Sequence, residues 1–436
     1  MAGVVIPLFE KDGDIFFVLT KRTSTVKIHK GEVSFPGGMY EPKDGNTKRT
    51  AIRECCEEIG VKDTDLEIGS LVKQEGCKKV LLHYGSESAR KSGLLDRVCR
   101  ALAAEGIACA ELGGVVPNPR LSKVYEGVEL CKKEEVDFIL AVGGGSVIDC
   151  GKAVSAMLAS EGSVKDYLEG IGAKKPPGMK VPFVAVPTTA GTGSEATTNA
   201  VLCDRQEGYK RSLRHEAHVP DVALVDPELT ISLPPALTTA CGLDAAAQLI
   251  EAYTSTKTDK ATDAPAIEAL ACVGEALPAL GLGLCHDLAL REKMSFAALV
   301  SGIALSRSGL GAVHGLAGPL GGLFPVPHGV ACGKLLFPVM SFVVKKVLDA
   351  QDQIARKRFA DIGRIFSGRG DADDTAACLA FLDVLRDWFQ KLRLPPLSSF
   401  GVTCADFDRI IAAADGKNSP AALTPKEMKA VLEIAR

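Results

Sequence analysis

The sequence predicts an α/β domain with a parallel sheet, then an all-α domain, with a short α+β fragment ahead of both. From Val80 onward, short apolar strands alternate with helical segments, the pattern of parallel βαβ units. After Leu233 strand signals nearly vanish and apolar positions recur at helical spacing. The start of the chain differs from both of these parts, because it has a Gly-Gly loop before a predicted acidic helix. We place the three parts at residues 1–72, 73–230 and 231–436.

The composition indicates a globular protein. The chain has 436 residues, of which 46% are hydrophobic and 24% charged, enough to bury more than one core. The 51 Lys and Arg residues against 54 Asp and Glu residues give a net charge of -3, with no pull toward nucleic acid or anionic membrane. No uninterrupted apolar run reaches the roughly 18 residues of a membrane span, and the start lacks the features of a signal peptide. We therefore expect a cytoplasmic protein that binds neither nucleic acid nor membrane.

The fourteen cysteines are scattered. Cys55 and Cys56 are adjacent, but no C-x-x-C spacing typical of zinc or redox sites occurs. We expect reduced, mostly buried thiols.

The first part combines strand and helix signals. Residues 4–9 and 14–21 are strand candidates, and a Gly/Pro turn at residues 35–38 precedes a helix predicted over residues 47–59. A polar stretch over residues 73–79 follows, after which the character of the sequence changes.

The α/β part contains a glycine run at the end of a strand. Strands are predicted over residues 80–85 and 138–142, with a helix near 94–105 between them. The second strand runs into Gly143-Gly144-Gly145-Ser146 and a helix from Val147 that contains Asp149 and Lys152. Glycines let backbone amides approach a pyrophosphate, and the amino terminus of the helix favours its negative charge. A plain tight turn is the alternative interpretation.

A second loop strengthens this interpretation. Residues 187–195, Pro-Thr-Thr-Ala-Gly-Thr-Gly-Ser-Glu, again follow a buried strand. Two such loops at strand carboxyl ends converge on the crevice where ligands of open α/β sheets bind, so we expect a Rossmann-like dinucleotide site. The candidate cofactor-binding residues are Gly85, Ser86, Ser88, Gly143, Gly144, Gly145, Ser146, Asp149, Thr188, Thr189, Thr192, Ser194 and Lys210.

The loop after the first strand bears on the choice of cofactor. An acidic residue there would bond the ribose 2′-hydroxyl of NAD, whereas small polar and basic residues tolerate a 2′-phosphate. Ser88, Arg90 and Lys91 lean toward NADP. A solvated surface turn explains the two basic residues equally well.

The helical part carries candidate metal ligands. Asp244 and Gln248 are four residues apart and share one helical face. Two of the seven histidines, His314 and His328, fall in the glycine-rich segment over residues 311–329. A histidine among apolar neighbours is more often a core residue than a ligand, but two in one such segment favour a site.

These features together resemble the iron-containing (group III) alcohol dehydrogenase family over about residues 76–436. The matching segments, in order, are GGGSVID, PTTAGTGSE, DVALVDPELT, LPPALTTACGLDA and VHGLAGPLGGLFPVPHG. The resemblance implies a dehydroquinate synthase-like architecture, in which a Rossmann-like domain binds NAD or NADP and an all-helical domain binds one divalent metal. It also implies a homodimer that interconverts a small alcohol and its aldehyde or ketone.

The resemblance places the metal ligands on Asp244, Gln248, His314 and His328. It places the catalytic role on Asp244, His314 and His328. Most family members have His at the second position, and an amide oxygen is a weaker ligand than imidazole for a first-row metal. The resemblance therefore allows a three-ligand site, completed by water or substrate, that suits zinc as well as iron. Gly318 stands where many members have a histidine near the nicotinamide, so a proton relay through that imidazole is absent.

The start of the chain resembles a Nudix hydrolase. Residues 31–61 look like a Nudix box, and LTKRT with SFPGG is similar to the coenzyme A diphosphatase branch. Glu54, Glu57 and Glu58 share a helical face and are candidate Mg²⁺ ligands. The segment has about half the residues that such a fold needs, so we expect an incomplete fragment, joined to the dehydrogenase part near residues 72–77.

Four functions follow. The first is a metal-dependent, NAD(P)-linked oxidoreductase acting on a small alcohol or aldehyde. The alternatives are a Mg²⁺-dependent diphosphohydrolase acting on a coenzyme A-like substrate, a polyol dehydrogenase such as one for glycerol, and a catalytically impaired or regulatory dinucleotide-binding fusion. The last is motivated by Gln248 and Gly318.

Overall fold

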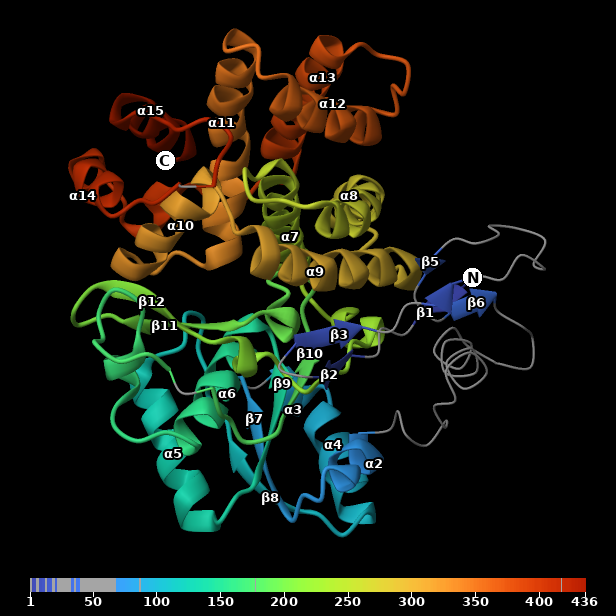
Figure 1. Ribbon diagram of the computed structural model, residues 1–436, viewed down its shortest axis with the longest axis vertical. Coiled ribbons are helices and arrows are strands. Elements are labelled where there is room, and N and C mark those ends of the chain that lie inside the picture. Colours follow the sequence, from blue (N-terminus) through green and yellow to red (C-terminus); the bar gives the residue numbers. More distant parts are fainter. Residues whose placement is uncertain are drawn as a thin grey trace.

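The computed structural model describes residues 68–85, 88–176, 178–416 and 418–436, together with short strands within the first 39 residues (Figure 1). The short strands pair antiparallel, β1 with β6, β2 with β3 and β4 with β5. Their bounds are Ala2–Val4 (β1), Leu8–Lys11 (β2), Asp14–Phe17 (β3), Thr20–Lys21 (β4), Val33–Ser34 (β5) and Gly37–Met39 (β6). The predicted helix at 47–59, and with it Glu54, Glu57 and Glu58, lies outside the described residues.

A five-stranded parallel sheet forms the centre of the α/β part, so the predicted βαβ units are confirmed. Its order is β13-β10-β9-β7-β8, and every pairing is parallel. The strands are Lys79–Tyr84 (β7), Ala108–Leu112 (β8), Phe138–Gly143 (β9), Phe183–Pro187 (β10) and Val222–Ala223 (β13). The sequence did not predict β8, because only one residue of this edge strand is buried and it lacks the apolar run of its neighbours.

Helices cover both faces of this sheet. They are Ile68–Gln74 (α2), Ser88–Lys91 (α3), Leu94–Ala104 (α4), Leu121–Glu134 (α5) and Gly145–Leu158 (α6). Successive residues of a strand point to opposite faces, so Ile139 of β9 packs in the cluster with α5 and α6, whereas Leu140 packs in the cluster with α2 and α4. Val72 of α2 is fully buried in this second cluster, which ties α2 to the sheet.

A β-hairpin lies between the sheet and the helical part. Its strands are Asn199–Asp204 (β11) and Tyr209–Arg214 (β12), and they pair antiparallel. Short 3-10 helices lie nearby, at Val164–Tyr167 (η3), Ser194–Ala196 (η4), Glu216–His218 (η5) and Pro227–Thr230 (η6). The sequence did not predict the hairpin, because its polar second strand, YKRSLR, carries no buried-strand signal.

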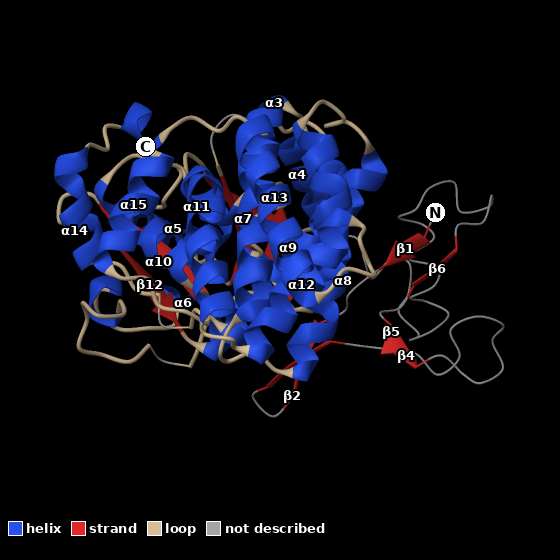
Figure 2. Ribbon diagram, turned by 90° about the horizontal axis from the view of Figure 1, so that it is seen from above, coloured by secondary structure: helices blue, strands red, loops and turns tan. Residues whose placement is uncertain are grey.

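From residue 235 onward the described residues form helices without strands, as predicted (Figure 2). The helices are Pro235–Thr254 (α7), Lys260–Gly281 (α8), Leu288–Ser308 (α9), Ala312–Leu323 (α10), His328–Asp349 (α11), Gln353–Ser367 (α12), Asp374–Lys391 (α13), Phe407–Ala412 (α14) and Pro425–Ala435 (α15), with 3-10 helices at Leu397–Phe400 (η7) and Cys404–Asp406 (η8). Aspartates cap several amino termini, for example Asp352 at α12 and Asp373 at α13. Helix α7 is buried along most of its length and forms the centre of this core.

Among the described residues, α8 is the single unbroken helix long and apolar enough to cross a membrane by length and composition. It packs against α7 and α9, and Leu270, Val273 and Leu277 belong to the helical core. This packing is that of a core helix.

The cysteines of the described residues are free, which agrees with the expectation of reduced thiols. Cys131, Cys150 and Cys378 are buried, and Cys404 is exposed.

Candidate active site

The first glycine loop joins β9 to α6. Gly144 precedes the helix, and Gly145 is its first residue. A Cβ at Gly145 would lie 2.2 Å from Thr192 Oγ1, and one at Gly144 would lie 3.2 Å from the Thr189 side chain. The two glycines therefore let the first loop pack directly against the second loop, at residues 187–195, and the predicted convergence of the two loops is confirmed.

Internal hydrogen bonds hold the second loop in place. Lys152, fully buried on α6, donates through Nζ to the carbonyl oxygens of Ser194 (2.8 Å), Thr197 (2.9 Å) and Asn199 (2.8 Å). Asp149 accepts from the Ser194 hydroxyl and, at 3.0 Å, from the backbone N–H of Val201. Burial lowers the pKa of Lys152 to about 8. Asp149 and Ser194 are thus bound to each other within the protein.

The third predicted loop follows β7, the neighbour of β9 in the sheet. Gly85 lies at its start and accepts a backbone hydrogen bond from Gly114 at 2.8 Å, whereas Ser86 is outside the described residues. Arg90 of α3 makes an ion pair with Glu111 of β8 at 2.8 Å and donates to the Tyr84 hydroxyl at 2.5 Å. Arg90, one of the basic residues predicted to tolerate a 2′-phosphate, is therefore paired with Glu111 within the protein.

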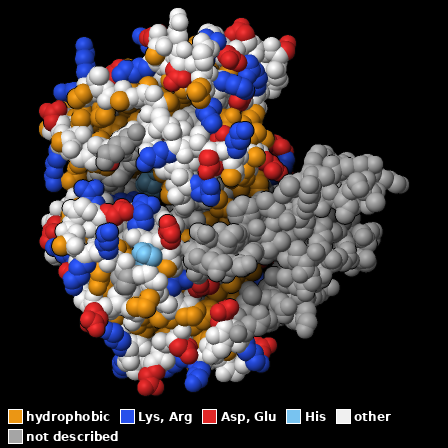
Figure 3. All heavy atoms as spheres, in the orientation of Figure 1, with side chains coloured by type: hydrophobic (Ala, Val, Ile, Leu, Met, Phe, Trp, Pro, Cys, Tyr) orange, Lys and Arg blue, Asp and Glu red, His pale blue; other side chains and the backbone are white. Residues whose placement is uncertain are grey.

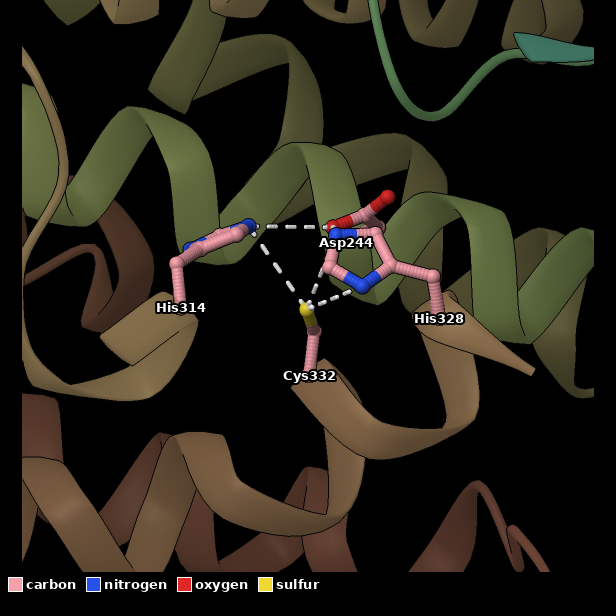
Figure 4. Close-up of side chains that lie close together, drawn as sticks. All are labelled: Asp244, His314, His328 and Cys332. Atoms are coloured by element: carbon pink, nitrogen blue, oxygen red, sulfur yellow. Dashed lines mark hydrogen bonds and ion pairs between the residues drawn. The ribbon is translucent and has the colours of Figure 1, made fainter. Parts of the chain in front are cut away.

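Asp244, His314, His328 and Cys332 converge at a second centre, between three helices (Figure 4). Asp244 comes from the middle of α7, His314 from the first turn of α10, and His328 and Cys332 from the first two turns of α11. One ligand atom of each lies within 4.8 Å of those of the other three. The structure thus brings together three predicted metal ligands and a cysteine that the sequence analysis did not select.

The spacing of these atoms fits a divalent metal. Bonds of about 2.0–2.3 Å around a tetrahedral ion put neighbouring ligand atoms about 3.3–3.7 Å apart. Asp244 Oδ1 lies 3.2 Å from His314 Nε2 and 3.7 Å from His328 Nε2. Cys332 Sγ lies 3.6 Å from His314 Nε2 and 3.7 Å from His328 Nε2. The edges of this cluster are therefore close to those of a tetrahedral site.

Glu251, two turns after Asp244 on α7, orients His314. Its Oε2 lies 2.7 Å from His314 Nδ1, and its Oε1 accepts from the backbone N–H of Val313 at 2.6 Å. The carboxylate thus caps the start of α10 and accepts a hydrogen bond from His314 Nδ1–H, which leaves Nε2 facing the cluster. A Cβ at Gly311 would lie 2.9 Å from Glu251 Oε1, which explains the glycine there.

Asp244 and His328 have the protonation states that metal binding requires at neutral pH. Burial raises the pKa of the Asp244 carboxyl, but the two histidines outweigh burial and hold the pKa at about 2. Burial and the charge of Lys210 lower the pKa of His328 to about 3. An ionised carboxylate and a neutral imidazole are the forms that bind metals. Despite burial, Cys332 and Asp244 hold the pKa of His314 above its usual value, and burial raises the pKa of the Cys332 thiol to about 12, so these two residues would release a proton when a metal binds.

Gln248 and Gly318, the two residues that depart from the family pattern, have clear surroundings in the structure. Gln248 is buried on α7, and its Oε1 accepts a hydrogen bond of 2.9 Å from the Ser301 hydroxyl of α9. Gly318 of α10 faces open space, since a Cβ there would meet nothing within 4 Å. A side chain at Gly318 would therefore project into a cavity.

This cavity, of about 540 Å³, lies between the β11–β12 hairpin and the helical part. Its size is in the range of small-molecule sites. His314 and Gly318 line it from α10, and Lys210 lines it from β12. Figure 3 shows Lys and Arg side chains beside the hollow between the two halves of the molecule. The basic residues of the lining are Lys210, Arg211, Arg214, Lys257 and Arg409.

Cys332 and Glu251 were not predicted from the sequence. Both carried a helical signal, since Cys332 is four residues after His328 and Glu251 is seven after Asp244, so each shares a face with a predicted ligand. The distances above show that each contacts the cluster or orients it.

Family models cover most of the chain. One described as "Iron-containing alcohol dehydrogenase" matches residues 61–227, and one described as "Fe-containing alcohol dehydrogenase family, C-terminal" matches residues 238–435. A NUDIX domain model matches residues 1–87, which confirms the Nudix resemblance of the first part. This last match overlaps the first and includes β7, which pairs within the parallel sheet.

Individual proteins give the same result. Alcohol dehydrogenase 4 of Schizosaccharomyces pombe is 33% identical over 375 residues, 85% of each chain. NAD-dependent methanol dehydrogenase of Bacillus methanolicus is 36% identical over 71% of this chain and 78% of that protein. A crystal structure of 1,3-propanediol oxidoreductase is 32% identical, has a TM-score of 0.77, and the match covers 85% of this chain and 95% of the other. The chain therefore belongs to the iron-containing alcohol dehydrogenase family.

Proposed function

We propose that the chain is a metal-dependent, NAD-linked oxidoreductase that interconverts a small alcohol and its aldehyde or ketone. One observation carries the proposal: His314, a member of the ligand cluster, lines the same cavity as Lys210 of the hairpin next to the glycine loops. A substrate in this cavity is thus within reach of the cluster. The relative named NAD-dependent methanol dehydrogenase supports NAD as the cofactor.

Asp244, His314 and His328 are the proposed catalytic residues, because they would hold the metal. When bound, the metal supplies Lewis-acid polarisation of the alcohol oxygen and lowers the pKa of the alcohol. Glu251 accepts from His314 Nδ1 and keeps Nε2 pointed at the cluster, so the orientation of this ligand is set before the substrate binds. Lys210 adds positive charge beside the cavity.

The glycine loops are the proposed cofactor site. Backbone amides at Gly143, Gly144, Gly145 and Ser146 would face the pyrophosphate at the amino terminus of α6. Gly85, Thr188, Thr189 and Thr192 border the same crevice at the ends of neighbouring strands. The use of NADP stays a proposal that rests on Ser88, Arg90 and Lys91, of which Arg90 is paired with Glu111.

A direct test begins with metal analysis of the purified protein. Reduction of NAD⁺ is then followed by absorbance with short-chain alcohols, before and after treatment with a chelator. The proposal predicts turnover that disappears with the metal and returns when zinc or iron is added. Turnover that survives complete removal of the metal would overturn it.

Diols and polyols belong in the same substrate screen. Relatives named 1,3-propanediol dehydrogenase, from Citrobacter freundii and Klebsiella pneumoniae, are 37% and 35% identical to this chain. Gly318 leaves open space beside His314, which gives room for a second hydroxyl group. A higher kcat/KM for 1,3-propanediol or glycerol than for propanol would identify a polyol dehydrogenase.

A second candidate activity rests on the NUDIX match at residues 1–87. We propose Glu54, Glu57 and Glu58 as Mg²⁺ ligands for a diphosphate of the coenzyme A type. Release of phosphoadenosine from coenzyme A in the presence of Mg²⁺, abolished by Glu57→Gln, would support this activity. Equal release by the variant would exclude the Nudix segment as its source.

We further propose that the chain is cytoplasmic, with parts at residues 1–72, 73–230 and 231–436, and that it forms the homodimer that the family resemblance implies. The first boundary falls within α2. Light scattering after size-exclusion chromatography measures the oligomeric state, and a monomer at working concentration would contradict it.

A further inference from the structure

We propose that Cys332 is the fourth protein ligand of the metal, so that Asp244, His314, His328 and Cys332 form a thiolate-containing site that selects zinc over iron. This inference rests on the metal site of the proposed function. It adds a ligand of a different chemical class from the carboxylate, amide and imidazole predicted from sequence.

The position of Cys332 on α11 fixes its sulfur toward the cluster. Cys332 lies one turn after His328, so both side chains leave the same face of the helix. Figure 4 shows the sulfur pointing between the two imidazoles. Sγ lies 3.6 Å from His314 Nε2 and 3.7 Å from His328 Nε2, the edges of a tetrahedral site with one sulfur.

The surroundings of Cys332 differ from those of the other buried cysteines. Cys131 and Cys150 belong to the apolar cluster under the sheet, and Cys378 belongs to the helical core and donates to the Arg356 carbonyl oxygen. Cys332 also belongs to the helical core, but unlike these three it has nitrogen and oxygen ligand atoms from three other residues within 4.8 Å of its sulfur. A cysteine needed only for packing requires no such neighbours.

Gln248 is already bonded elsewhere. Its Oε1 accepts the Ser301 hydroxyl at 2.9 Å, and Ser301 is itself fully buried. To bind a metal through Oε1 the amide would have to give up this bond, and the Ser301 hydroxyl would then donate to the Ala298 carbonyl oxygen at 2.7 Å. The sulfur of Cys332 already lies among the other ligand atoms, so Cys332 is the better-placed fourth ligand.

The balance of charge also favours a thiolate. A divalent cation with Asp244 as carboxylate and Cys332 as thiolate is a neutral group, whereas a neutral thiol leaves one positive charge. Asp244 and Cys332 are buried and the two histidines are partly buried, and burying net charge is costly. On binding, the thiol loses its proton to solvent as the metal–sulfur bond forms. Soft thiolate ligands favour zinc and cobalt over iron, which is the basis of the proposed selectivity.

Cobalt provides a spectroscopic test. The full chain is freed of metal with a chelator and titrated with Co²⁺ alone. A cobalt–thiolate bond gives an intense near-ultraviolet charge-transfer band, whereas oxygen and nitrogen ligands leave only weak visible bands. We expect the band in the unmodified chain and in the control variant Cys378→Ser, and its loss in Cys332→Ser. We also expect Cys332→Ser to bind zinc at least about tenfold more weakly, with its preference moved toward iron.

A second measurement needs no variant, so it holds even if Cys332→Ser fails to fold. X-ray absorption at the zinc edge of the unmodified, zinc-loaded chain should show one sulfur at about 2.3 Å beside nitrogen and oxygen at about 2.0–2.2 Å. A shell of nitrogen and oxygen alone, or a charge-transfer band that persists in Cys332→Ser, would overturn the role of Cys332 while leaving a metal-dependent dehydrogenase intact. A chain that binds neither Co²⁺ nor Zn²⁺ would overturn both.

Discussion

The two functional regions of this chain are built differently. In the glycine loops at the ends of β9 and β10, the groups proposed to contact the cofactor belong mostly to the backbone, and each loop is one continuous stretch of sequence. In the metal cluster the groups are side chains, contributed by α7, α10 and α11, and Asp244 and Cys332 are 88 positions apart in the sequence. The first region depends on local sequence, and the second depends on how three helices pack.

This difference decides how each region tolerates change. Side chains such as Lys152 support the loops from behind, so their loss should weaken folding and cofactor binding together. The cluster sits in a helical core that is extensive without it, so the loss of a ligand should remove the metal and leave the fold. Four substitutions test this contrast.

His314→Ala should have the largest effect. It removes a ligand that contacts both Asp244 and Cys332, so bound metal should fall to background. Turnover should fall by about 10³-fold or more, because Lewis-acid polarisation is worth several kcal/mol. Metal content, kcat/KM and NAD binding are measured side by side, with the exposed His286→Ala as control. If the metal cluster and the cofactor loops tolerate change independently, NAD binding is retained in this variant. A parallel loss of NAD binding would contradict that independence.

Lys152→Met should act on the other region. It removes the donor to three buried carbonyl oxygens and should lower the free energy of unfolding by about 3 kcal/mol or more. NAD binding should weaken as well, while metal content stays at one per chain in the fraction that remains folded. The exposed Lys133→Met on α5 is the control for denaturant unfolding. Equal stability of the two variants would show that the buried lysine does not support the loop.

The sequence predicted the loops almost completely. The glycine run, the Thr-rich segment and their convergence at one end of a parallel sheet all followed from strand–loop–helix patterns. It could not predict that Asp149 and Ser194 bond to each other, because they are 45 residues apart and only packing brings them together. Among the strands it missed, β8 and β12 have mostly polar or only partly buried residues.

The metal cluster was predicted in part. Asp244, His314 and His328 were found through the family resemblance, and the structure brings them together. Cys332 and Glu251 were missed because an acidic residue or a cysteine in a helix is usually unremarkable without its neighbours. The hydrogen bond from Ser301 to Gln248 links two helices and has no local sequence signal.

Glu251→Gln should have an intermediate effect. The amide keeps the shape of the side chain but loses its charge, and its single oxygen cannot accept from both the Val313 N–H and His314 Nδ1–H as the carboxylate does. Zinc affinity should fall about 10- to 100-fold, as is typical when the partner of a metal-binding histidine is changed. Competition with a chromophoric chelator measures this affinity, and the exposed Glu268→Gln on α8 is the control. Unchanged affinity would show that Glu251 only caps α10.

Glu111→Gln should have the smallest effect, and it tests the part of the cofactor site that depends on side chains. The carboxylate of Glu111 pairs with Arg90 at 2.8 Å, and both side chains are about half exposed. Its removal should release Arg90 and remove a charge that repels a 2′-phosphate. Because exposed ion pairs are weak, we expect kcat/KM for NADP⁺ to rise by no more than about fivefold relative to NAD⁺.

The control for this change is Glu126→Gln, which removes the acidic partner of Lys123 on α5 and should leave the cofactor ratio unchanged. Added salt screens exposed charges, so the gain of Glu111→Gln with NADP⁺ should shrink as ionic strength rises. An equal gain with NAD⁺ and NADP⁺ would place the effect on the fold of α3 rather than on the phosphate. The choice between NAD and NADP would then depend on the backbone of the loops. The other contacts proposed between the glycine loops and the cofactor are also made mostly by the backbone.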